Sequence, residues 1–270
     1  MNINKNLSEP GSNPLLTIVI YELKESLRNM RVLVYGGALA GFGSLVLFFS
    51  GKSPQAAASL LNLVLLIVPL FGLLFGALSF RDSLPFMQLL LSRGVDRTRV
   101  YLGKWLGLSI SLGVSVAFGL GVSAIFGKKS FTIILFLMSL AVGLQFVFVS
   151  LSMLLGVMVR KREMIPGAAL LIWFYLYVLY DLLVLYAGTL SNEYPLEVPV
   201  FVLLILNPLD LVRLIFLIQT DLSQLMGFST ALAVRTLGGK LGAGVAFLLL
   251  GIWTAAPLYA GLRIFKNRDL

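Results

Sequence analysis

Residues 80–104 form a charged stretch, FRDSLPFMQLLLSRGVDRTRVYLGK, between two apolar runs that are each long enough to cross a bilayer. Its first half carries an apolar patch and its second half carries arginines. A short helix at the membrane surface suits this order, because an apolar face can press on another protein while arginines bind lipid headgroups. We therefore predict a docking helix over residues 81–99. The residues expected to make its contacts are Leu84, Phe86, Met87, Leu89, Leu90, Arg93 and Arg97.

The composition points to a membrane protein. Hydrophobic residues make up 59% of the 270-residue chain and charged residues only 12%, whereas a soluble domain of this length needs a far more polar surface. The chain has neither Cys nor His, the usual soft ligands of copper and zinc, so we expect no metal site. We interpret the net charge of +9 as basic loops that fix the orientation in the membrane, and we expect no nucleic-acid partner.

Six apolar segments predict an all-α polytopic protein with six transmembrane helices. The segments are residues 32–50, 60–80, 100–126, 131–159, 165–190 and 241–262. Before the first of them, residues 15–31 alternate apolar and charged side chains at helical spacing, which predicts an interfacial helix after a loose tail. We expect four regions. Residues 1–31 form the tail and the interfacial helix, and residues 32–190 form five spans, with the docking helix at 81–99 as a cytoplasmic coupling helix. Residues 191–240 form an extracytoplasmic helical lobe, and residues 241–270 form the sixth span and a basic cytoplasmic tail.

Residues 191–240 do not fit a seventh span. Residues 198–206 are apolar, but two ionisable groups follow, and each costs roughly 2.5 to 3.5 kcal/mol near a helix centre. We predict two or three helices outside the membrane, partly sunk in its interface. Asn207 is a good N-cap, Pro208 suits the first helical position, and Arg213 can pair with Asp210 three residues earlier. These four residues are either a structural helix start or an exposed contact for an extracytoplasmic partner.

The basic residues predict the orientation. With six spans and a cytoplasmic N-terminus, the outer segments hold few lysines and arginines, as the positive-inside rule requires. Those left outside are Lys52, Lys128, Lys129, Arg213, Arg235 and Lys240. We therefore expect a multi-pass protein with both termini and the docking helix in the cytoplasm.

The chain offers little chemistry of its own. The two candidate phosphate loops, Gly51-Lys52-Ser53 and Gly239-Lys240, lack the upstream glycine at the required spacing, so the energy must come from another chain. Asp181 is the one carboxylate that we place within a span, and Tyr177 lies one turn before it, so its hydroxyl could bond the carboxylate on the same helix face. This intramembrane polar pair is either a helix-packing contact, a residue of substrate passage or gating, or a contact for an outside partner.

Three glycine pairs at GxxxG spacing predict close helix contacts. They are Gly37 with Gly41, Gly72 with Gly76, and Gly103 with Gly107.

The chain resembles the ABC-2 type transporter permeases. The resemblance lies in YELKESLRN at residues 21–29, in the loop after the second span, and in the six-span plan. In that family the loop usually reads LLS-x-P-x-x-R, followed by Gly-Lys. Leu90, Leu91, Ser92, Arg97, Gly103 and Lys104 match this pattern, while Gly94 replaces the usual proline.

Within that family, residues 173–183, 206–213 and 256–258 are similar to the permeases of the Nos copper-processing system. This resemblance implies a homodimer in membrane lipids, bound to two copies of a NosF-like ATPase that binds ATP and Mg²⁺. It also implies a periplasmic NosD-like protein on the outer lobe and a role in maturing the copper centres of nitrous oxide reductase. The chain itself is expected to bind no cofactor and to have no catalytic residue. The alternatives are an ABC-2 exporter of a lipid, drug or peptide and, from another class, an autonomous secondary transporter or an intramembrane enzyme.

Overall fold

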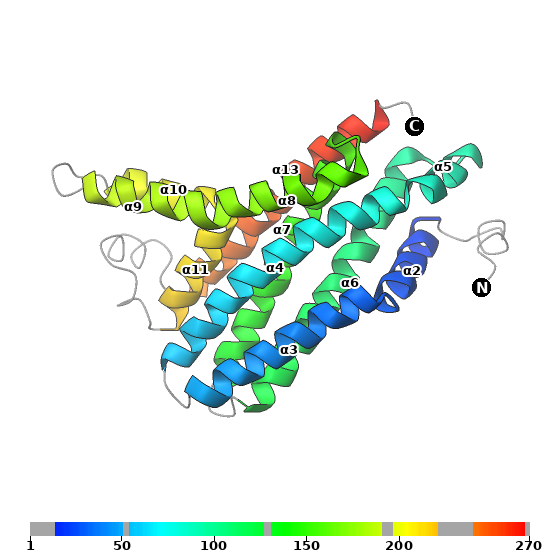
Figure 1. The fold of residues 1–270 in the computed structure, drawn as a ribbon. Helices are drawn as coiled ribbons and strands as arrows, with labels where there is room; N and C mark the ends of the chain where they lie inside the picture. The colour runs from blue at the N-terminus through cyan, green and yellow to red at the C-terminus, as the bar shows by residue number, and fades with distance from the viewer. Residues whose placement is uncertain (1–13, 51–53, 127–130, 191–196, 221–239, 268–270) are drawn as a thin grey trace.

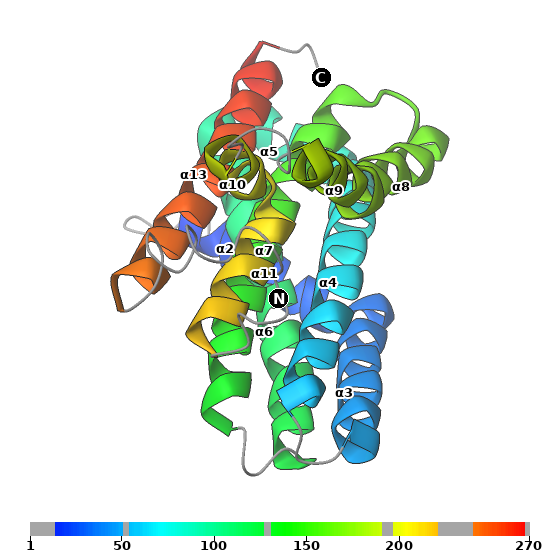
Figure 2. The same ribbon diagram turned by 90° about the vertical axis from the view of Figure 1, so that its left-hand side faces the viewer.

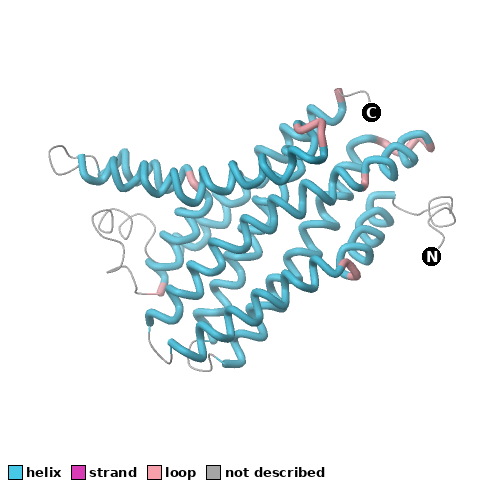
Figure 3. The backbone as a smooth tube through the Cα atoms, in the orientation of Figure 1, coloured by secondary structure: helices cyan, strands magenta, loops and turns pink. Residues whose placement is uncertain are grey.

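The computed structural model describes residues 14–50, 54–126, 131–190, 197–220 and 240–267, and over these ranges the chain is helical with no strand (Figure 3). Most of the predicted loose tail lies outside the described residues. So do residues 191–196 and 221–239 of the predicted lobe, and residues 51–53 and 239 of the two candidate phosphate loops.

Within the described ranges, six helices are long and apolar enough to cross a membrane, in agreement with the six predicted spans. The first four are α3 (Met30–Ser50), α4 (Pro54–Asp82), α6 (Arg97–Phe126) and α7 (Phe131–Met158). The fifth is built from α8 (Ile165–Phe174), the π-helical turn η3 (Tyr175–Leu179) and α9 (Tyr180–Leu190), and the sixth is α13 (Lys240–Lys266). A 3-10 turn, η2 (Arg162–Met164), precedes α8.

The central helices pack closely, with α4 and α13 on α7 and α3 on α6 (Figures 1 and 2). Glycines permit this at several places. A Cβ on Gly72 would lie 2.8 Å from Nε2 of Gln145 on α7, so this predicted glycine pair does face a neighbouring helix. In contrast, a Cβ on Gly37 or Gly41 would meet nothing within 4 Å. The face of α3 that carries these two glycines is therefore open in the single chain.

Two short helices lie at one end of the bundle, together with the last residues of α13 (Figure 1). They are α2 (Pro14–Leu27), which packs on α6, and α5 (Leu84–Ser92), between α4 and α6. We call this the α5 end. The helix α5 ends at Ser92, and Gly94 follows two residues later with a φ of 81°, which is favourable for glycine. The Gly94 N–H donates to the Leu91 carbonyl at 3.0 Å. A glycine thus follows the helix at the position where ABC-2 type permeases usually have proline.

The described helices of the region between residues 191 and 239 are α10 (Glu197–Leu206) and α11 (Pro208–Gln219). The first helix runs beside α9, and the second turns into the bundle, where it contacts α13, α7 and α4 (Figure 1). Most of α11 is buried, because apolar residues surround its few polar ones. The sequence predicted helices partly sunk in the interface, and the structure places α11 deeper, among the spans. Whether the region is extracytoplasmic stays a prediction.

Candidate functional site

The predicted docking helix α5 turns much of its apolar side toward its own chain. Met87 and Leu90 are each only 2% exposed, and the ring of Phe86 stacks on Tyr21 of α2 with ring centroids 5.2 Å apart. Leu84 is half-buried, whereas Leu89 is 49% exposed. The residues of α5 and its C-cap that face outward are Pro85, Gln88, Leu89, Ser92 and Arg93. We call these five residues the α5 stripe.

The predicted docking residues therefore divide into two groups. Leu89 and Arg93 belong to the α5 stripe, while the buried ones hold α5 against the bundle. Arg97 also acts within the chain, because its Nη1 donates to the carbonyls of Phe265 at 3.4 Å and Lys266 at 2.8 Å. A cation at the last carbonyls of a helix stabilises that end. Docking of a partner on α5 stays a prediction, and its surface is narrower than the seven residues first proposed.

Behind α5, Glu22 of α2 and Lys104 of α6 form a buried ion pair. Lys104 Nζ lies 2.7 Å from Glu22 Oε1, and each side chain is only 6% exposed. Lys104 also donates to Ser79 Oγ of α4 at 3.3 Å, and Ser26 Oγ donates to Glu22 at 3.2 Å. We call the ion pair of Glu22 and Lys104 the lysine pair. Together with the bond to Ser79 it joins α2, α4 and α6. Sequence reasoning missed it, although a lysine inside an apolar span is by itself a signal that a partner is near.

Glycines on α6 allow α2 to come close enough for this ion pair. A Cβ on Gly103 would lie 2.8 Å from Ile18 Cγ2, and one on Gly107 would lie 2.5 Å from Glu22 Cβ. The predicted close contact at these glycines is therefore a contact with the chain's own α2. A small cavity of about 10 Å³ remains between α2, α5 and α6, and its walls include Phe86 and Lys104. Burial raises the pKa of the nearby Tyr21 phenol, and Glu25 and Glu22 add to the rise.

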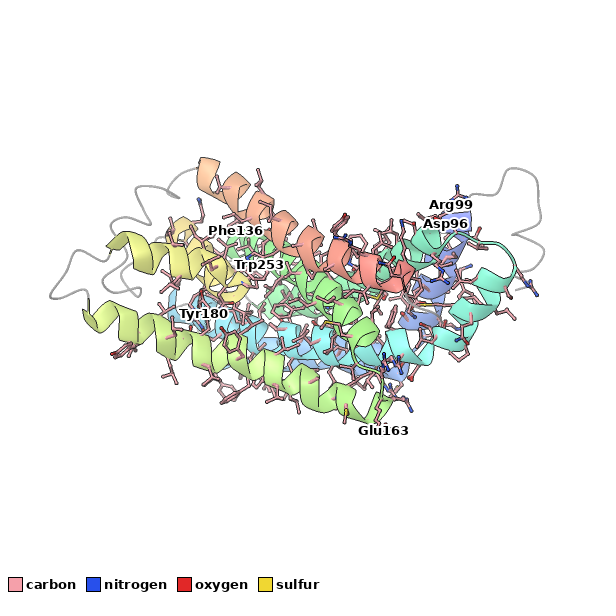
Figure 4. All side chains as sticks on the ribbon, turned by 90° about the horizontal axis from the view of Figure 1, so that it is seen from above. Asp96, Arg99, Phe136, Glu163, Tyr180 and Trp253 are labelled. Atoms are coloured by element: carbon pink, nitrogen blue, oxygen red, sulfur yellow. The ribbon has the colours of Figure 1, made fainter. Side chains whose placement is uncertain are left out.

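Exposed contacts join α4 to the turn between α7 and α8. Arg162 Nε lies 2.8 Å from Asp82 Oδ1, with both side chains largely in solvent, and Arg81 donates to the Arg160 carbonyl. Figure 4 labels Asp96, Arg99 and Glu163 at this α5 end and Tyr180 toward the other end of the molecule. The α5 end thus carries many charged groups, and several of them hold neighbouring helices together.

Toward the other end, one arginine lies between two carboxylates. Arg213 Nη1 of α11 lies 2.9 Å from Asp181 Oδ1 of α9 and 3.2 Å from Asp210 Oδ1 of its own helix. The exposed fractions are 29% for Arg213, 40% for Asp181 and 2% for Asp210. The predicted pairing of Arg213 with Asp210 is confirmed, and the residue predicted within a span, Asp181, joins the same group.

Asn207 completes this group, which we call the arginine cluster (Asp181, Asn207, Asp210 and Arg213). Its Oδ1 accepts from the Leu209 N–H at 3.1 Å, so the predicted N-cap is confirmed. Its Nδ2 donates to Asp210 Oδ2 and to the Leu176 carbonyl, each at 2.9 Å. Leu176 belongs to the π-turn η3, where the changed bonding register leaves a carbonyl open to a side-chain donor.

Tyr177 has a different role from the predicted one. Its ring stacks on Trp173 with centroids 5.4 Å apart, and the Asp181 carboxylate accepts from Arg213 instead. Pro208 takes the predicted first position of α11 and is buried. Two sets of residues that the sequence analysis treated separately, Asp181 with Tyr177 and Asn207 through Arg213, therefore lie in one region.

These arrangements position helices. In the lysine pair and in the arginine cluster, the charged side chains bond to each other and to neighbouring polar groups. Within the described ranges, no three acidic side chains gather in a group that could hold a metal ion. The geometry fixes the positions of neighbouring helices at each of the two ends of the bundle.

Comparisons with known proteins identify the family of the chain. Residues 16–270 match the family described as "ABC-2 family transporter protein". A protein from Stutzerimonas stutzeri named "Probable ABC transporter permease protein NosY" is 29% identical over 280 residues, covering 95% of this chain and 99% of the relative. A protein of the same name from Pseudomonas aeruginosa is 30% identical, covering 94% of this chain and 98% of the relative. The chain belongs to the ABC-2 family of transporter membrane proteins.

Proposed function

We propose that this chain is the permease subunit of an ABC transporter in the bacterial inner membrane, with both termini in the cytoplasm. Membership of the ABC-2 family implies an ATPase partner and dimerisation. The observation that carries the proposal is α5, a short helix that its own buried residues hold at one end of the bundle while the α5 stripe stays exposed. ATP and Mg²⁺ belong, in this proposal, to a separate ATPase, and this chain binds no cofactor.

We extend the proposal to copper-centre maturation of nitrous oxide reductase, because the two relatives carry the name NosY. In that setting a homodimer of the chain binds two copies of a NosF-like ATPase, and a NosD-like periplasmic protein contacts the region around α10 and α11. The chain has no Cys and no His, which makes it poorly suited to pass copper through itself. Copper is then handled by companions, and copper uptake by liposomes that contain only this chain would refute that part.

The coupling runs through α4 and α6, the two spans that α5 connects. ATP-driven closure of the partner pushes α5, and the buried Met87 and Leu90 carry the push into the bundle. The lysine pair supports this step because it joins α2, α4 and α6 directly behind α5. A push on α5 therefore moves several spans together.

The test is Leu89→Asp in the chain co-expressed with the ATPase encoded beside it. A buried charge at the centre of an interface weakens binding by about tenfold or more, so co-purification of the ATPase should be lost. Phe131→Asp is the matched control, because Phe131 is an exposed apolar residue at the start of α7, toward the opposite end of the bundle from α5. Equal recovery of the ATPase with both variants would count against docking on the α5 stripe.

An ABC-2 exporter of a lipid, drug or peptide is the second candidate. The burial of α11 favours it, because a buried helix leaves less surface for an extracytoplasmic partner. Co-purification of a periplasmic protein together with the ATPase supports the partner-driven function, and an ATPase alone supports the exporter. An autonomous secondary transporter or an intramembrane enzyme becomes the better account if no ATPase binds.

A further inference from the structure

The helices α9 and α10 lie side by side and project beyond the other helices (Figures 1 and 2). We call these two helices, residues 180–190 and 197–206, the α9–α10 arm. Its described side chains are largely exposed, including Leu182, Leu185 and Val202. In contrast, the adjoining helix α11 is buried, with Leu211, Val212 and Leu214 completely enclosed. An exposed arm is thus attached to a helix that is fixed in the bundle.

Polar contacts hold the arm in place. Tyr180 donates to the Leu203 carbonyl at 2.7 Å, which joins α9 to α10 within the arm. Asn207 donates to the Leu176 carbonyl at the base of the arm. Arg213 bonds Asp181. Of these three contacts, this ion pair is the one that joins the buried α11 to α9 directly. The bond from Asn207 to Leu176 supports it at the base of the arm.

The two carboxylates that share Arg213 differ in how they would respond to movement. Asp210 is on the same helix as Arg213, three residues earlier, and is buried, so this contact persists when α11 and the arm separate. Asp181 is 40% exposed in the single chain, so its carboxylate is less enclosed by protein than that of Asp210. When the contact with Asp181 breaks, Arg213 keeps Asp210 as a partner, and the charge left without its cation is Asp181, the less enclosed of the two carboxylates. The π-turn immediately before α9 is also a place where helices bend.

We propose that Arg213 is a positioning residue with two states. Bonded to Asp181 and Asp210, it holds the α9–α10 arm against α11; bonded to Asp210 alone, it releases the arm. The proposal goes beyond the proposed function and does not depend on the docking of an ATPase at α5, since it concerns only contacts within the chain.

The test measures the distance between the arm and the bundle in the full chain in lipid nanodiscs. The chain has no cysteine, so spin labels attach only at introduced sites. Leu185→Cys on the arm and Phe131→Cys at the start of α7 are suitable because both side chains are exposed. Labelled chain is mixed with an excess of unlabelled chain, so that each dimer carries one labelled copy. Double electron–electron resonance then gives the distribution of distances within one chain.

Asp181→Asn should add a second population of distances, because Arg213 then keeps only Asp210. Asp210→Asn should leave the distribution as narrow as in the unmodified chain, because Arg213 and Asp181 then form a one-to-one pair. The double exchange Asp181→Arg with Arg213→Asp should restore the single population, because an arginine again lies between two carboxylates. If Arg213 had only a structural role, Asp181→Asn and Asp210→Asn would change the distance distribution in the same way, and the double exchange would not restore the single population.

Thermal unfolding and gel filtration check that each labelled variant is folded. Arg213→Lys serves as a second variant, because a lysine keeps the charge but binds fewer oxygens at once, so a partial second population is expected. The proposal is overturned if Asp181→Asn leaves the distribution unchanged, or if Asp210→Asn releases the arm as fully as Asp181→Asn does. Either result can be obtained whether or not an ATPase docks on α5, so the two proposals fail separately.

Discussion

The lysine pair and the arginine cluster differ in number of charges and in access to water. At the α5 end, one lysine meets one glutamate, both are almost completely buried, and glycines of α6 allow the two helices to touch. Toward the other end, one arginine meets two aspartates, and two of these three side chains are partly exposed. In the lysine pair each charge has one charged partner, whereas Arg213 has a second carboxylate available when it loses one.

This difference suggests how the bundle divides its work. A one-to-one buried pair cannot open without leaving a charge unpaired in a dry environment, so α2, α4 and α6 should move as one body behind α5. An arginine with two partners on different helices can lose one and keep the other. We therefore expect rigidity at the α5 end and movement at the α9–α10 arm, and four substitutions test that contrast in order of decreasing effect.

The largest effect is expected for Lys104→Met. It leaves the Glu22 carboxylate buried without its cation, which costs about 3–5 kcal/mol for a buried pair. Thermal unfolding in detergent should show a strongly lowered midpoint. The double variant Glu22→Gln with Lys104→Met has no buried charge and should recover most of the loss, and a double variant as unstable as the single one would contradict the assignment.

A smaller loss is expected for Gly107→Ala. The new Cβ would fall 2.5 Å from Glu22 Cβ and push α2 away from α6, at a cost of about 1–3 kcal/mol. Gly37→Ala is the matched control, since a Cβ there meets nothing and alanine favours a helix by up to about 1 kcal/mol. Opposite shifts of the unfolding midpoint are expected, and equal shifts would show that α2 is not held by this close contact.

Arg213→Gln should cost less than Lys104→Met. The glutamine amide can still donate to the buried Asp210 carboxylate, whereas the methionine of Lys104→Met offers Glu22 no donor, so we expect about 1–2 kcal/mol. The midpoint of thermal unfolding measures it under the same conditions. A loss as large as that of Lys104→Met would remove the contrast between the two ends.

The smallest effect is expected for Arg162→Gln. Arg162 is 59% exposed and its partner Asp82 is 41% exposed, and exposed ion pairs contribute little, so the change should stay within about 0.5 kcal/mol. The same unfolding measurement serves as a baseline for the other three. A midpoint lowered as far as in Arg213→Gln would mean that exposed pairs stabilise this chain as much as the arginine cluster does.

The sequence predicted what depends on local patterns. Apolar runs of sufficient length located the six spans, and the residues after Leu206 predicted the cap and the pairing of Asp210 with Arg213, because those contacts join neighbours in the chain. It did not predict the contact between Glu22 and Lys104, whose partners lie far apart in the sequence. It also missed the depth of α11, because the cost of its ionisable groups was counted without the partners that the fold supplies.

The docking surface shows the same limit. The apolar residues of α5 predicted a contact surface, but periodicity alone could not say which side the chain covers with its own α2 and α6. The structure leaves Leu89 exposed and buries Met87 and Leu90. A helix with apolar residues on several sides needs its neighbours to be known before its free surface can be named.

The most direct test of the central claim is the labelling of Leu89→Cys in the otherwise cysteine-free chain, in membrane vesicles of known orientation. A membrane-impermeant thiol reagent should modify this residue only from the cytoplasmic side, and the ATPase should protect it. Phe131→Cys, an exposed residue at the start of α7, should react from the opposite side and stay unprotected. Labelling of Leu89→Cys from outside, or with the same rate in the presence of the ATPase, would contradict the account.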